Sequence, residues 1–111
     1  MEAWLDRLAA ALASGDLPGA RAACAEAASL ALAHYDREEP TLFTRLEAHL
    51  PDFVRKLRLQ HDEARELAAH LSNTGLPGAE WLQLARRFLA ISQHNIIEEE
   101  RDLFVLADRL R

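Results

Sequence analysis

The chain has 111 residues, half of them apolar, and a formal net charge of -5 at pH 7, which favours a single domain over residues 1–111 and excludes the basic surface that binds nucleic acid or an anionic membrane. Its one cysteine, Cys24, excludes both an internal disulfide and a cysteine-ligated metal site. No apolar stretch approaches the roughly 20 residues of a membrane span, and the early acidic residues do not fit a signal peptide, so we expect a cytoplasmic protein.

Clusters of glycine and proline divide the chain into four segments with helical periodicity. The clusters lie at residues 14–19, 50–52 and 72–78. We predict four helices, near residues 2–14, 19–49, 52–72 and 79–110. Pro40 is expected to kink the second helix without ending it. Because the connections are short, the sequence predicts an all-α, up-down-up-down four-helix bundle with a short first helix.

The two halves of the chain resemble each other. The recurring features are the turn 17–20 with 76–79, His34 with His94, and Leu42-Phe43 with Leu103-Phe104. We therefore predict an internal duplication with pseudo-twofold symmetry. Such symmetry would hold equivalent groups at one level of the bundle.

The second segment carries an ionisable pair on its apolar face. His34 and Glu38 are four residues apart and share one face of a helix. Leu42, Leu46 and Leu50 continue the same row. An imidazole and a carboxylate in line with core leucines need a partner that makes their burial tolerable.

The fourth segment repeats this pair with two competing acids. Helical spacing from His94 selects Glu98, whereas counting back four residues from Leu103 selects Glu99, as Glu38 lies four before Leu42. An extra residue between His94 and Leu103 explains the conflict and would fit a π-bulge, which is often found at functional sites. We prefer Glu99 and keep Glu98 as the alternative.

The third segment adds His61 at a matching height. His61 lies 15 residues before the turn at Leu76, and His94 lies 18 after it. At about 1.5 Å per residue the two heights agree within roughly 5 Å. Across the turn at Pro51, Glu38 lies 13 residues before and His61 lies 10 after. Three segments therefore deliver metal-ligating groups to one level.

These residues resemble the hemerythrin-like (HHE) cation-binding domains. The family pattern is a helix with one His and then a helix with H-x-x-x-E-E-x-x-L-F, the pair being repeated. The segment 34–43 matches at every defined position, His61 matches the lone His of the second repeat, and His94 with Glu98 or Glu99 matches the last helix. The resemblance spans essentially the whole chain.

The resemblance implies a non-haem di-iron centre. Manganese or zinc could replace the iron in such a centre. The resemblance also implies that Glu38 and Glu99 (or Glu98) bridge the two ions and that His34, His61 and His94 complete the ligand set. Such centres bind a small ligand such as dioxygen reversibly, sense oxygen or iron, or react with peroxide or nitric oxide.

One family feature is missing, a His on the first helix. The duplication places Glu2 opposite His61, and a carboxylate is a competent ligand for iron or manganese. Glu2 is therefore the candidate replacement. The alternative is that Glu2 only begins the helix, where an acid favours the helix dipole.

Three functions remain open from the sequence. The leading one is a metal-binding module that binds or senses dioxygen or iron; the others are a peroxide- or nitric-oxide-reactive diiron enzyme and a metal-free interaction module with a degenerate site. The short first helix also leaves the end holding Leu46, Leu50 and Leu106 with three helices. We expect a second copy to cover that groove, giving a homodimer.

Overall fold

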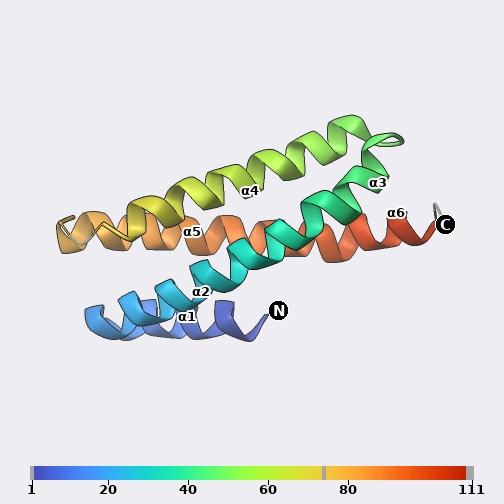
Figure 1. Ribbon diagram of the computed structural model, residues 1–111. Helices are drawn as coiled ribbons and strands as arrows, with labels where there is room; N and C mark the ends of the chain where they lie inside the picture. The colour runs from blue at the N-terminus through green and yellow to red at the C-terminus, as the bar shows by residue number, and fades with distance from the viewer. Residues whose placement is uncertain (1, 74, 110–111) are drawn as a thin grey trace.

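The computed structural model describes residues 2–73 and 75–109 and is built from helices (Figure 1). In chain order the elements are α1 (Ala3–Ser14), α2 (Leu17–Glu38), the π-helical segment η1 (Glu39–Phe43), α3 (Thr44–Glu47), α4 (Pro51–Leu71), α5 (Gly78–Glu98), the π-helical segment η2 (Glu99–Leu103) and α6 (Phe104–Arg109). α2, η1 and α3 form one continuous rod, as do α5, η2 and α6. The described residues include no strand. The predicted all-α four-helix bundle is confirmed, and the helix boundaries predicted within the described residues lie within two residues of the observed ones.

The helix ends follow from a few turn residues. α1 ends at Gly15, whose φ of 77° is the left-handed conformation that glycine adopts without a steric penalty. Pro18 and Pro51 stand in the first turns of α2 and α4, where the missing amide hydrogen would have no helical partner. Pro77 directly precedes α5. The loops between these ends are short, so consecutive helices run antiparallel.

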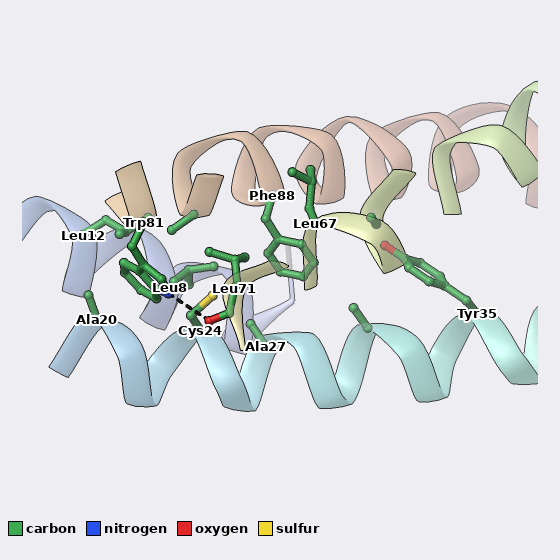
Figure 2. Packing of buried hydrophobic residues seen from close by; sticks show 13 residues of the cluster. Leu8, Leu12, Ala20, Cys24, Ala27, Tyr35, Leu67, Leu71, Trp81 and Phe88 are labelled. Atoms are coloured by element: carbon green, nitrogen blue, oxygen red, sulfur yellow. Dashed lines mark hydrogen bonds between the residues drawn. The ribbon is translucent and has the colours of Figure 1, made fainter. Parts of the chain in front are cut away.

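The apolar core is divided into two clusters along the bundle. The larger one contains residues of α1, α2, α4 and α5 and is shown in Figure 2. Within it, the indole N–H of Trp81 donates a hydrogen bond of 2.9 Å to the carbonyl of Leu71. The smaller cluster consists of Phe43, Leu46, Val54 and Leu57. Buried Glu38 and His61 each lie in the chain between a residue of the larger cluster and one of the smaller cluster.

The predicted duplication is visible in the burial pattern of the long helices. Buried residues of the α2 rod recur in the α5 rod at a constant spacing of 61 residues: Ala20/Trp81, Cys24/Ala85, Ala27/Phe88, Ala31/Ser92, Tyr35/Ile96 and Glu38/Glu99. In α1 and α4 the spacing is 59: Leu5/Ala64, Leu8/Leu67 and Leu12/Leu71. The two halves of the bundle are therefore built on one template.

Pro40 does not end the second rod, as predicted, because the helix continues through it in η1 and into α3. Proline has no amide hydrogen and its ring collides with the preceding turn, and the chain widens here into the π-helical segment η1. Two hydroxyls bond carbonyls in this region: Thr41 Oγ1 donates to the carbonyl of Arg37 (2.7 Å) and Thr44 Oγ1 to that of Glu39 (3.0 Å). The π-bulge predicted in the fourth segment is also present, as η2.

The groove expected at the short-helix end involves residues inside and outside the described part of the chain. Leu46 is fully buried within the chain and Leu50 is half-buried. The side chains of Leu103, Phe104 and Leu106 lie outside the described residues, as does residue 110. Over residues 2–73 and 75–109, no helix has the length and apolar character needed to cross a bilayer.

Candidate metal centre

Two imidazoles and two carboxylates meet where the long helices pass one another. His34 and Glu38 come from α2, His61 from α4, and Glu99 is the first residue of η2. One ligand atom each from His34, Glu38 and Glu99 can be chosen so that all three lie within 4.8 Å of one another. This spacing is small enough for one cation to reach all three side chains.

Each carboxylate faces both imidazoles. Glu38 places Oε2 3.2 Å from Nε2 of His34 and Oε1 3.6 Å from Nε2 of His61. Glu99 does the same, with Oε2 3.6 Å from Nε2 of His34 and Oε1 2.9 Å from Nε2 of His61. The two acids therefore lie between the two rings, with one oxygen of each acid directed to each ring.

The two ends of this arrangement differ in exposure. The His61 side chain is completely buried, whereas that of His34 is 33% exposed. A hollow of about 320 Å³ adjoins His34 and is also lined by Glu2, Trp4 and Arg37. The arrangement is closed at His61 and open to solvent at His34.

The amphipathic pattern of the helices explains why these side chains face inward. His61 lies between Leu57 and Ala64 on the buried face of α4, at the spacings of four and three that define one helix face. Glu38 ends the buried row of α2, and Glu99 occupies the matching position 61 residues later. The polar ligands are continuations of apolar rows.

His61 is held in place on both faces and at both nitrogens. Its ring is stacked between Tyr35 (centroids 3.8 Å apart) and Phe43 (4.9 Å). Nδ1 donates to Oε2 of Glu39 at 2.9 Å, and Arg65 Nη1 contacts that same oxygen at 2.8 Å. A metal-binding histidine usually makes such a contact through its other nitrogen. With Nδ1–H committed to Glu39, Nε2 is the nitrogen directed at the acids.

The pKa values show the cost of placing these charges together. Burial, together with the neighbouring Glu99, raises the pKa of the Glu38 carboxyl. Burial also acts to raise the pKa of Glu99, but hydrogen bonds from His34 and His61 outweigh it and lower the pKa. The carboxylates of Glu38 and Glu99, 3.2 and 3.6 Å from Nε2 of His34, raise the pKa of His34 to about 10. The pair of acids is tolerated because positive charge gathers around it.

A cation fits this donor set. Both oxygens of Glu38 are buried and neither makes a hydrogen bond of normal geometry to the described residues, although a buried carboxylate without partners is costly. Ligand atoms about 2.0–2.2 Å from a metal lie about 3.0 Å from each other when adjacent. The separations of 2.9–3.6 Å between the imidazole nitrogens and carboxylate oxygens are close to that value. Imidazole and carboxylate together suit iron, manganese and zinc.

His94 and Glu98 lie apart from this group. The His94 side chain is 63% exposed, and its Nε2 is 2.8 Å from Oε1 of Glu98. Lys56 Nζ lies 3.0 Å from the same oxygen, and Gln60 Nε2 donates to the other at 3.2 Å. These contacts lower the pKa of Glu98 despite its burial. The structure thus brings Glu99 to the centre and leaves Glu98 in a separate ion pair.

Helix phase explains the position of His94. The buried residues of the two long rods are related by a spacing of 61 residues, which makes Asn95 the counterpart of His34. From the sequence alone, the expected counterpart is His94, at a spacing of 60. Asn95 is buried and donates from Nδ2 to Gln60 Oε1 at 2.8 Å. The π-helical segment begins at Glu99, after His94, so it does not rotate His94 inward. The shared level predicted for three histidines is reached by His34 and His61 only.

Glu2 is exposed and lines the hollow beside His34. No ion pair within 4.0 Å joins it to a described residue. The duplication pairs Glu2 with His61 at a spacing of 59 residues, but the short α1 begins only at Ala3. Glu2 is near the centre without being part of it.

From the sequence, Glu39 is expected either on a solvated face or in contact with a metal ligand, and Arg65 has no assigned role at the site. Glu39 directly follows a proposed ligand and looks like part of a solvated acidic run. A usable signal was the spacing of four between His61 and Arg65, which places a cation on the same side of α4 as the imidazole. That cation favours an acid beside it, and Glu39 is the acid that both residues contact.

The comparison with protein families gives one result. The family model described as the hemerythrin HHE cation binding domain matches residues 1–107. No curated protein and no solved structure matches the chain.

Proposed function

The chain belongs to the hemerythrin HHE cation-binding domain family, and we propose that it holds a pair of iron ions between His34 and His61 in order to bind dioxygen or sense iron. Cation binding is the property that the family and the cluster of His34, Glu38 and Glu99 have in common. The choice of iron, the number of ions and the small ligand are the proposed part.

The observation that carries the proposal is the state of Glu38. Its two oxygens are buried without a hydrogen bond and are directed to different imidazoles, one to His34 and one to His61. Glu99 repeats this orientation. Two carboxylates that each face two separate nitrogen ligands are suited to contact two cations at once, and the positive charge would remove the cost of burying both acids.

The side chains around His61 hold its ring rigidly, whereas the surroundings of His34 leave that end of the site accessible. Tyr35, Phe43 and Glu39 fix the ring of His61, so that end of the site needs little rearrangement. His34 is partly exposed and adjoins the hollow of about 320 Å³, which gives a small molecule a route to that end. Iron, when bound, supplies the redox couple and the open coordination positions that dioxygen binding requires.

The test is anaerobic loading with ferrous iron followed by a count of iron per chain. We expect about two ions per chain for the wild type and at least about a tenfold loss of affinity for Glu38→Gln, which keeps the shape but removes the charge. Glu98→Gln is the matched control, because the Glu98 carboxylate is a buried acid already paired with Lys56. Equal iron binding by both variants would place the metal elsewhere.

Exposure of the loaded protein to small molecules then separates the functions. An absorption band that forms in air and disappears when oxygen is removed supports reversible dioxygen binding. Steady consumption of hydrogen peroxide or nitric oxide instead identifies the enzyme alternative. A wild-type chain that takes up no iron, manganese or zinc would contradict the proposal and leave the interaction module.

A further inference from the structure

A second hollow, of about 360 Å³, lies between α2 and α4 at the end of the bundle away from the metal centre. Its floor is formed by the buried side chains of Cys24, Leu71 and Trp81, which Figure 2 shows close together. Ala28 and Ala68 stand on its two walls. In Figure 1 α2 and α4 meet at α3 and lie apart at this end. The volume falls within the range of small-molecule sites, roughly 300–1,000 Å³.

The cationic side chain of Arg21 lines this mostly apolar hollow. The guanidinium of Arg21 lies over the Trp81 ring, 5.4 Å from its centroid. Among the described residues no carboxylate lies within 4.0 Å of that guanidinium. Arg21 is half-buried, so its hydrogen-bond donors remain available at the edge of an apolar surface. Guanidinium groups in such positions bind carboxylates in a directed way.

The symmetry of the chain shows that the hollow is not a general consequence of the fold. At the spacing of 61, the counterparts of Arg21 and Ala28 are Leu82 and Leu89. Both leucines are partly buried and packed against the main core. The first half of the chain thus has a charge and a small side chain where the second half has two leucines. The hollow is a local property of α2.

We propose that this hollow binds a small apolar carboxylate, with the anionic group on Arg21 and the hydrocarbon part over Trp81 and Leu71. The apolar floor selects for a hydrocarbon body, and the single available cation selects for one negative charge. The site is independent of the metal centre, because Arg21 and Ala28 are six or more residues from His34 along α2.

The binding can be followed through Trp81. A Trp4→Phe background leaves Trp81 as the sole tryptophan, and sodium octanoate is titrated below its micelle concentration. We expect a saturable change in fluorescence. Neutral 1-octanol should bind about tenfold more weakly, as should octanoate to Arg21→Gln, because each loses the charge-assisted hydrogen bond. Ala28→Leu, which copies Leu89, should abolish the saturable signal.

Controls keep this test decisive. Arg86→Gln removes an exposed arginine of α5 outside the hollow and should leave octanoate affinity unchanged. Ala68→Leu fills the hollow from the opposite wall and should act like Ala28→Leu, with helical circular dichroism confirming the fold of each variant. Octanoate binding that persists in both folded leucine variants overturns the proposal. So does the absence of a saturable signal, equal affinity for 1-octanol, or an equal loss in Arg86→Gln.

Discussion

Nδ1 of His61 lies 2.9 Å from Oε2 of Glu39, and the opposite nitrogen of the same ring lies 2.9 Å from Oε1 of Glu99. Burial tends to raise the pKa of Glu39, but the contacts with Arg65 and His61 outweigh it and lower the pKa. Glu39 is therefore an ionised acceptor that holds the proton of His61 on Nδ1 and directs Nε2 to the two central acids.

Glu39→Gln should weaken metal binding by about 10–100-fold without removing a ligand, because the amide orients His61 less firmly. Competition with a coloured chelator measures the affinity. Glu100→Gln is the matched control, since Glu100 follows Glu99 as Glu39 follows Glu38 and is exposed. A loss of the same size in both variants would mean that only the net charge matters.

The metal-free protein should lose stability as the pH rises from about 6.5 to about 10. The neighbouring carboxylates of Glu38 and Glu99 raise the pKa of His34 from 6.5 to about 10 in the folded chain. A group with a raised folded-state pKa stabilises fully below its unfolded pKa and loses that contribution as the pH passes its folded value. Urea unfolding in the presence of a chelator measures this slope. His34→Gln should flatten it, whereas the exposed His49→Gln should not.

Phe88→Ala should lower the free energy of unfolding by about 3–5 kcal/mol, because it leaves a cavity in the larger core cluster. Phe88 is fully buried there, as Figure 2 shows among its neighbours. Leu59→Ala removes an apolar side chain that is 63% exposed and should change the free energy by less than about 0.5 kcal/mol. Similar losses in the two variants would contradict the assigned core.

The homodimer expected from the short first helix stays a prediction. Light scattering at high micromolar concentration should give about twice the chain mass of 12.5 kDa. Leu46 is covered within the chain, so the contact would rest on the exposed Ile97 and Val105 rather than on that residue. Ile97→Glu with Val105→Glu should then give a single-chain mass. A wild-type monomer under these conditions contradicts the prediction.

The fold was predictable because each level of the sequence favours the same structure. Proline and glycine mark the helix ends, the apolar rows have helical spacing, and the loops are too short for anything but antiparallel neighbours. The central cluster was predictable to the extent that its members continue those rows. His34, Glu38 and His61 lie on buried faces that the apolar residues alone define.

The position of His94 was not predictable from spacing. One extra residue rotates a helix face by about 100°, and the outcome depends on which side of Glu99 the π-helical segment lies. The chain could in principle place it before or after that residue. The sequence left Glu39 between a solvated face and a contact with a ligand, because its role depends on Arg65 and His61, which come from another helix.

The buried, unbonded oxygens of Glu38 should make the stability of this chain depend on a bound cation. A chain without an ion carries the penalty of a dehydrated carboxylate in its interior, whereas a loaded chain does not. Transient opening should therefore be more frequent in the chain without its cation, and proteases act on opened chains. Limited proteolysis should then cleave the cation-free chain faster than the loaded one.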